Sequence, residues 1–588
     1  MRRVIVFFCF FFGLATLYSQ TTTPFEADPE QNTTAEYHEA IAFYEALAQS
    51  HPTQFRLDSI GATDSGQPLH LGILSKSGIF DPSAVREKGD LVLFVNNAIH
   101  PGEACGVDAT MMLVRDFLEK PNEYSLPADV TLVFIPFYNI GGGLNRGSYS
   151  RANQNGPYAY GFRGNAKNLD LNRDFIKTDS KNAQAFNQAF TKWNPELFID
   201  NHTSNGADYQ YSLTLIATQV NKMSAPLAAY LTNDMLPHLY KDLRERGWEM
   251  TPYVYVQNTP DEGIAGFLDL PRYSTGYATL HHTIGFMPET HMLKPFKNRV
   301  WSVYHFMSSM IDLAHQDKAK ILAARKQAIE DDRTAKSLDI NWTIDPTKVD
   351  TVQFKGYEAK YKPSKISGID RLYYDHEAPW TKTIPFFNTY KVTTSVEVPT
   401  AYVLPQAYSE LIQRLEWNGV KVHRLAKDTV LQYQQYYIEE FDTRDAYEAH
   451  YLHSNVQVRT VEREWHYQAG DFVIFTDQNK IRYIVETLEP QAPDSYFAWN
   501  FFDGILQQKE YFSSYVFEDL ALEYLEENPD LQKELEAKKA EDPKFAESGR
   551  AQLDFVYKRS PHYEPTHRLY PVSRWFGQAN IIPLEKAK

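Results

Sequence analysis

The stretch VNNAIHPGE, residues 95–103, places His100 and Glu103 directly after an apolar run, in a turn built from proline and glycine. A second apolar run, Leu197 to Asp200, leads in the same way to His202. Zinc in a catalytic site takes three protein ligands and keeps a further position open for water. Two histidines and one glutamate at the ends of apolar runs therefore predict a His₂Glu zinc site. The alternative is that these polar residues only form hydrogen bonds at strand ends.

The surrounding sequence predicts an α/β fold. Strand-like apolar runs occur at 69–74, 91–95 and 130–135, and a helical run at 109–118 separates the last two. This order is typical of a βαβ unit in a sheet that is buried on both faces. The spacing of apolar residues also predicts a helix over 37–48. We expect a mixed, mostly buried sheet flanked by helices, with His100, Asn139 and His202 in the loops that follow its strands.

The second half of the chain has a different character. One or two helices are predicted over 300–335, and a polar stretch then marks a domain boundary between Lys336 and Lys348. Beyond it we expect an α+β accessory domain, because strand and helix patterns alternate without any ligand or nucleophile motif. The predicted strands are 352–360, 391–398 and 472–476, and the predicted helices are 408–418, 480–488, 520–527 and 529–539.

The first nineteen residues have the order of a secretory signal peptide: Arg2 and Arg3, an apolar core over 4–17, then small and polar residues. The apolar core is shorter than the ~20 residues that a membrane-spanning helix needs. We therefore expect cleavage near Ser19, export to the periplasm or the medium, and no stable membrane insertion. Three regions are predicted: a signal peptide (1–19), a catalytic domain (20–340) and the accessory domain (341–588).

Composition excludes several classes of partner and chemistry. The chain carries a net charge of −16, which makes nucleic acid an improbable partner. Only Cys105 remains after removal of the leader, so no internal disulfide can form, and this thiol is expected to pack as a small apolar group behind Glu103. A serine hydrolase is disfavoured because the sequence contains no Gly-x-Ser-x-Gly elbow.

Four elements together resemble the M14 family of zinc carboxypeptidases: His100-Pro-Gly-Glu103, Leu171-Asn172-Arg173, His202 and the late Glu289. The resemblance covers roughly residues 35–315. It implies that His100, Glu103 and His202 bind one zinc ion per chain. It also implies that Glu289 is the general base, which takes a proton from the zinc-bound water and returns it to the leaving amine.

The resemblance implies two substrate-binding groups. Arg151 occupies the place of an arginine that polarises the scissile carbonyl, and Arg146 is the alternative for that role. Asn172 and Arg173 match the pair that binds the free C-terminal carboxylate of a peptide, for which the planar guanidinium is suited.

Two features of the substrate site are left open by the sequence. The chain has Gly102 where several family members have an additional substrate arginine, so the resemblance does not give the side-chain specificity. Tyr273 and Tyr277 are both candidates for the tyrosine that covers the terminal residue. Arg272 is a candidate for an acidic substrate group or for a structural ion pair.

The predicted activity is hydrolysis of the C-terminal peptide bond by attack of a zinc-bound water. The nearest alternative is a peptidoglycan stem-peptide or other amide hydrolase on the same fold. A further alternative is an inactive member that binds peptide or glycan through its long C-terminal half.

Overall fold

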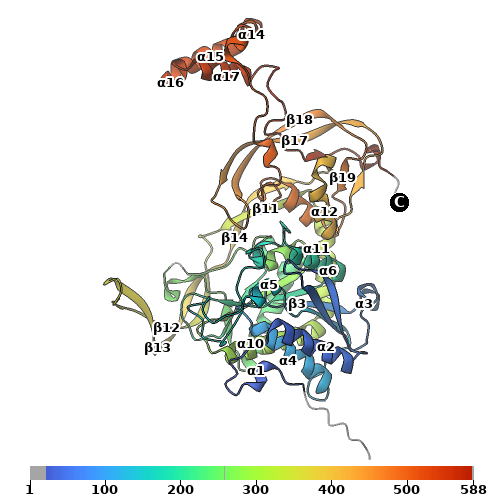
Figure 1. The fold of residues 1–588 in the computed structure, drawn as a ribbon, viewed down its shortest axis with the longest axis vertical. Helices are drawn as coiled ribbons and strands as arrows, with labels where there is room; N and C mark the ends of the chain where they lie inside the picture. Colours follow the sequence, from blue (N-terminus) through green and yellow to red (C-terminus); the bar gives the residue numbers. More distant parts are fainter. Residues whose placement is uncertain (1–20, 257, 586–588) are drawn as a thin grey trace, which may run out of the picture.

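The computed structural model describes residues 21–256 and 258–585, so the predicted signal peptide lies outside the described residues. Its centre is a nine-stranded mixed sheet with the order β1-β2-β4-β3-β5-β10-β7-β8, in which β6 pairs with β10 (Figure 1). The strands are β1 (Phe55–Ala62), β2 (Pro68–Leu74), β3 (Leu91–Asn96), β4 (Val130–Ile135), β5 (Leu197–Asp200), β6 (His202–Ser204), β7 (Leu213–Ala217), β8 (Met250–Pro252) and β10 (Ile284–His291).

The predicted βαβ unit is confirmed. Strands β3 and β4 run parallel and are connected by helix α4 (Cys105–Glu119). Every residue of both strands is buried, which explains why their sequences are continuous apolar runs and do not alternate. Alternate residues of β3 enter different cores: Leu93 packs on one face of the sheet, and Phe94 on the other.

Helices cover both faces of this sheet. The first face carries α2 (Tyr37–Ser50), α4, α8 (Leu236–Glu245) and α10 (Phe296–Gln316), whose apolar residues share one core. The opposite face carries α6 (Lys181–Trp193) and α9 (Ser274–Thr279), and its core continues into the C-terminal part of the chain. The predicted α/β class is therefore confirmed. Helix α11 (Lys318–Thr334) follows α10 as a separate helix.

The C-terminal part, residues 341–588, contains a six-stranded sheet with the order β16-β19-β15-β20-β17-β18. Helices α12 (Ser409–Trp417) and α13 (Ile481–Leu488) pack between this sheet and the N-terminal part (Figure 1). The strands are β15 (Ala401–Leu404), β16 (His423–Arg424), β17 (Thr429–Thr443), β18 (His453–Tyr467), β19 (Phe472–Phe475) and β20 (Ser573–Trp575).

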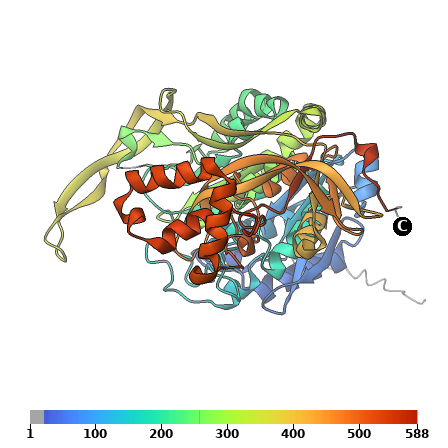
Figure 2. The same ribbon diagram turned by 90° about the horizontal axis from the view of Figure 1, so that it is seen from above.

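Three further features belong to this half of the chain. Strand β11 (Ser337–Ile344) pairs with β14 (Tyr390–Glu397). Strands β12 (Asp350–Pro363) and β13 (Asp370–Phe387) form a long hairpin that pairs with β9 (Ile264–Ala265) and projects from the body (Figure 2). A cluster of helices projects beyond the six-stranded sheet: α14 (Ser514–Glu527), α15 (Pro529–Glu541), α16 (Pro543–Ala546) and α17 (Gly549–Tyr557) (Figure 1).

Polar contacts as well as apolar packing join the two halves of the chain. The Tyr277 hydroxyl donates to Asn418 Oδ1 at 2.6 Å, and Arg272 forms a 2.8 Å ion pair with Asp494. None of the described helices is long and apolar enough to cross a bilayer.

Candidate metal centre and substrate pocket

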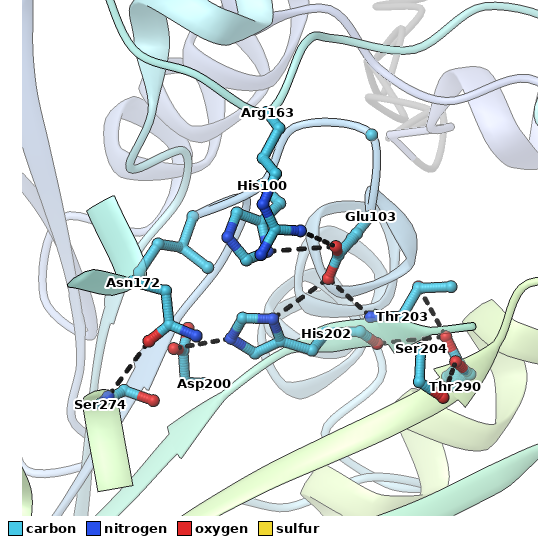
Figure 3. A network of polar contacts seen from close by, with 12 residues as sticks. His100, Glu103, Arg163, Asn172, Asp200, His202, Thr203, Ser204, Ser274 and Thr290 are labelled. Atoms are coloured by element: carbon cyan, nitrogen blue, oxygen red, sulfur yellow. Dashed lines mark hydrogen bonds and ion pairs between the residues drawn. The ribbon is translucent and has the colours of Figure 1, made fainter. Parts of the chain in front are cut away.

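Three buried side chains converge at the carboxyl ends of β3 and β5. His100 lies in the turn after β3, Glu103 lies just before α4, and His202 begins β6 (Figure 3). One potential ligand atom from each of them lies within 4.8 Å of the other two. The Nδ1 atoms of both histidines face the Glu103 carboxylate, each at 3.1 Å from one of its oxygens. The three predicted ligands are thus brought together by the parallel strands.

The outer nitrogens of the two histidines are already bonded. His100 Nε2 is 2.8 Å from Asp170 Oδ1, and His202 Nε2 is 2.9 Å from Asp200 Oδ2. Carboxylates in this position fix the ring orientation and leave Nδ1 as the ligand atom. His100 Nδ1 is buried, and its 3.1 Å approach to Glu103 Oε1 does not have the geometry of a hydrogen bond. The donor set therefore fits a divalent metal ion, and two imidazoles with one carboxylate are the chemistry that zinc prefers.

Two arginines approach the Glu103 carboxylate. Arg151 Nη2 is 2.5 Å from Glu103 Oε1, and its Nη1 donates to Gln154 at 3.1 Å. Arg163 Nη1 lies 3.6 Å from the same Glu103 oxygen, while its Nε donates to Asp170 at 2.9 Å. The Arg163 side chain is 45% exposed, against 12% for Arg151, so Arg163 is the freer of the two in the pocket. Arg146 instead donates to the Thr34 carbonyl.

The absence of a side chain at Gly102 leaves the space through which the Arg151 side chain reaches the metal centre. A Cβ atom at this position would lie 2.4 Å from Arg151 Nε and 2.8 Å from its Cδ, closer than carbon and nitrogen atoms can approach. The guanidinium of Arg151 therefore occupies the space that a side chain at position 102 would fill.

Glu289 lies on β10, directly opposite His202 of β6 in the strand register, and it lines the same cavity. Its side chain is almost fully buried, and burial raises its pKa to about 8, an effect that the positive charge of His202 opposes. A divalent cation beside it favours the ionised form. The position suits a carboxylate that exchanges a proton with a water or a substrate held at the metal centre.

Arg173 and Asn172 line the cavity from a short 3-10 turn (Leu171–Arg173). Arg173 Nε donates to the Tyr447 hydroxyl at 2.8 Å, and Nη1 donates to the Asn172 carbonyl at 2.8 Å. Its guanidinium also lies over the Tyr273 ring, 4.5 Å from the centroid. Tyr273 lines the cavity, whereas Tyr277 is fully buried below it. Arg272 is taken up by its ion pair with Asp494, the structural alternative that the sequence left open.

The cavity that the three predicted ligands, Glu289, Asn172 and Arg173 line has a volume of about 500 Å³. The metal centre and the arginines contribute to its polar lining. Apolar or aromatic side chains also line it, among them Ile216, Tyr253, Phe267 and Met287. Among the described residues that line it, the only carboxylates are Glu103 and Glu289.

Four residues of this site were not singled out from the sequence: Arg163, Asp170, Asp200 and Tyr447. Asp200 lies two residues before His202, and Asp170 lies three residues before Arg173. A metal-bound histidine usually donates its other nitrogen to a carboxylate, so Asp200 beside His202 was an available signal, whereas Asp170 lies 70 positions from His100. Arg163 and Tyr447 have no such signal, because only folding brings Arg163 to the cavity and Tyr447 to Arg173.

Residues 40–232 match the family model described as zinc carboxypeptidase (Peptidase M14). The chain is 21% identical over 442 residues to carboxypeptidase 2 of Trichophyton equinum, covering 72% of this chain and 75% of that protein. It is 20% identical over 444 residues to carboxypeptidase 2 of Trichophyton rubrum, with the same coverage.

Among solved structures, carboxypeptidase A of Helicoverpa armigera aligns with a TM-score of 0.38 and 13% identity, over 50% of this chain and 75% of that one. A metallo-carboxypeptidase from Burkholderia cenocepacia aligns with a TM-score of 0.36 and 15% identity, over 49% and 70%. The family match falls on the segment that supplies His100, Glu103, Asn172, Arg173 and His202. The chain therefore contains a zinc carboxypeptidase (Peptidase M14) domain over residues 40–232, as its resemblance to that family of metallopeptidase hydrolases predicted.

Proposed function

We propose that the chain removes the C-terminal residue of peptides, with one zinc ion held by His100, Glu103 and His202. The observation that carries this proposal is the shared cavity: the three ligands, Glu289 and the Asn172-Arg173 pair all line it. An endopeptidase cleaves internal peptide bonds, so its mechanism does not require an arginine beside the metal to bind a terminal carboxylate. The alternatives of an amide hydrolase with another substrate and of an inactive binding protein gain no specific support.

The residues of the cavity divide the reaction between them. Bound zinc supplies a Lewis acid that polarises a carbonyl and lowers the pKa of a water. Arg173 and Asn172 bind the terminal carboxylate and so place the last peptide bond beside the metal centre. Glu289 accepts a proton from the attacking water and delivers it to the leaving amine. Arg151 remains the sequence-based candidate for the group that stabilises the oxyanion, and the greater freedom of Arg163 makes it the competing candidate.

The apolar residues among the cavity lining favour peptides that end in an apolar or aromatic residue. Ile216, Phe267 and Met287 offer no hydrogen bond or charge to a polar terminal side chain. A basic terminal side chain would need a carboxylate, and the lining carboxylates among the described residues are those assigned to the metal and to proton transfer.

Two proposals concern the chain as a whole. We propose that residues 1–19 direct export to the periplasm or the medium. We also propose that residues 20–340 and 341–588 are the catalytic and accessory domains, with a division near the start of β11.

The metal assignment predicts that His202→Ala purifies with little zinc and no peptidase activity, because one of three ligands is lost. Elemental analysis of the purified variant measures the metal directly. His38→Ala, which changes an exposed histidine of α2, is the matched control and should keep full zinc content. Full zinc occupancy in His202→Ala would contradict the ligand set.

Glu289→Gln should keep zinc and still bind peptide, because the amide preserves the shape of the site. Turnover should fall by at least ~10²-fold, the lower end of general-base contributions. Single-turnover kinetics together with zinc analysis separate the loss of chemistry from the loss of metal. Near-normal turnover in this variant would show that another group accepts the proton.

Arg151→Ala and Arg163→Ala distinguish the two oxyanion candidates. The variant that loses the oxyanion partner should keep zinc and lose roughly 10²–10³ in kcat. If Arg163 has that role, Arg151→Ala should instead weaken zinc binding by roughly 10–100-fold, because Arg151 holds the ligand Glu103. Zinc titration and kcat are measured on both variants, and a kcat loss confined to Arg151→Ala would restore the sequence-based assignment.

Arg173 predicts a strong preference of the wild type for acetylated dipeptides ending in phenylalanine over their C-terminal amides. The amide lacks the anion that the guanidinium binds. Arg173→Ala should remove most of this preference by lowering kcat/KM for the free acid alone. Equal cleavage of acid and amide by the wild type, or cleavage of internal bonds, would refute the carboxypeptidase proposal without touching the zinc assignment.

A further inference from the structure

The loop between β17 and β18 reaches out of the C-terminal part and meets the turn that carries Asn172 and Arg173. Three of its side chains bond to this region of the N-terminal part. The Tyr447 hydroxyl accepts from Arg173 Nε at 2.8 Å, Glu448 Oε2 accepts from the Asp170 backbone N–H at 2.8 Å, and His450 Nε2 is 2.8 Å from Asp179 Oδ2.

The tip of this loop is a tight turn whose backbone angles are unfavourable for most residue types. Tyr447 and His450 exchange two backbone hydrogen bonds, of 2.7 and 3.0 Å, so only Glu448 and Ala449 separate them. Both of these residues are in the left-handed region, with φ of 51° and 66°. Such turns normally use asparagine or glycine at these positions, because other side chains are strained there. The turn is held in this form by what its side chains contact.

Tyr447 determines which nitrogens of Arg173 remain for a ligand. With Nε bonded to Tyr447 and Nη1 to the Asn172 carbonyl, Nη2 has no hydrogen-bond partner within the described chain. The ring of Tyr447 stacks 6.2 Å from Trp499 with an interplanar angle of 19°, which fixes the hydroxyl in place. The arginine side chain has three rotatable bonds beyond Cβ. A fixed hydrogen-bond acceptor at Nε therefore reduces the number of orientations that the guanidinium can take.

Glu448 acts on the same segment through the backbone. The Asp170 N–H that it accepts belongs to the residue whose carboxylate holds both His100 Nε2 at 2.8 Å and the Asn172 N–H at 2.9 Å. One turn of the C-terminal part is therefore bonded to the carboxylate-binding arginine and to the support of a metal ligand.

We propose that the turn Tyr447–His450 completes the substrate-carboxylate site from the C-terminal part of the chain, and that Tyr447 is a positioning residue for Arg173. This inference rests on the proposed role of Arg173 as the group that binds the terminal carboxylate. It gives the C-terminal part a share in substrate binding, in addition to its packing on the catalytic domain.

Tyr447→Phe in the full-length protein tests this inference, because it removes the hydroxyl and keeps the stacked ring. For an acetylated dipeptide ending in phenylalanine, KM should rise by about tenfold while kcat stays within about twofold, as expected when a hydrogen bond to a charged binding group is lost. Cleavage of the corresponding amide should not change. Zinc content and the melting temperature should match those of the control.

Tyr437→Phe is that control. Tyr437 lies on β17, the strand that leads into this loop; its hydroxyl donates to the Pro565 carbonyl at 2.7 Å, and Arg459 lies over its ring at 4.7 Å. The variant therefore loses a comparable hydroxyl bond beside a comparable guanidinium, remote from the cavity, and should keep the wild-type KM.

A double-mutant cycle distinguishes positioning through Arg173 from a general structural effect. If Tyr447 acts through Arg173, Tyr447→Phe should have no further effect in the Arg173→Ala background, because residues that act on one contact are not additive. Additive losses, a wild-type KM in Tyr447→Phe, or a loss of zinc or melting temperature beyond that of Tyr437→Phe would each overturn the inference.

The cycle also separates this inference from the proposed function. If the wild type prefers free acids and Arg173→Ala abolishes that preference while Tyr447→Phe keeps it, only the role of Tyr447 is refuted. If the wild type does not distinguish acid from amide, the role of Arg173 fails and that of Tyr447 fails with it.

Discussion

The site depends on one buried carboxylate, that of Glu103. A carboxylate removed from water is costly unless it is paired and hydrogen-bonded, and here it faces two imidazoles, two guanidinium groups and the Thr203 backbone N–H, which donates at 2.7 Å. These groups hold the pKa of Glu103 well below its usual range although burial acts in the opposite direction. The positions of the two imidazoles are set by the parallel order of β3 and β5, since His100 and His202 follow those two strands.

The sheet itself was predictable because its physical signal is local. Strands β3, β4 and β5 are buried on both faces, and a strand in that environment must be a continuous apolar run. Strands β17 and β18 were not predicted. Their residues mix buried and exposed positions, and the segment Glu462–Glu464 is polar on both sides. What stabilises them is pairing between segments far apart in the sequence, which no local pattern reports.

The residues of the site also divide into those with a local sequence signal and those that only long-range contacts bring together. The three ligands, Asn172, Arg173 and Glu289 occur in short motifs or at strand ends, so sequence alone brought them into consideration. Arg163 resembles any other loop arginine in the sequence, and it becomes a candidate only through its 2.9 Å contact with Asp170 and its position in the cavity lining. Tyr447 lies 274 positions from the arginine that it contacts, and its contribution requires the two halves of the chain to dock.

The projecting helices α14–α17 have a different relation to the rest of the molecule. Their nine buried apolar residues form a cluster of their own, separate from the cores on either side of the main sheet. A unit whose apolar contacts are internal can open and close without the remainder of the protein, because no shared packing couples the two. Heating should therefore melt this appendage as a cooperative unit of its own, while the domain that holds the cavity keeps its native packing.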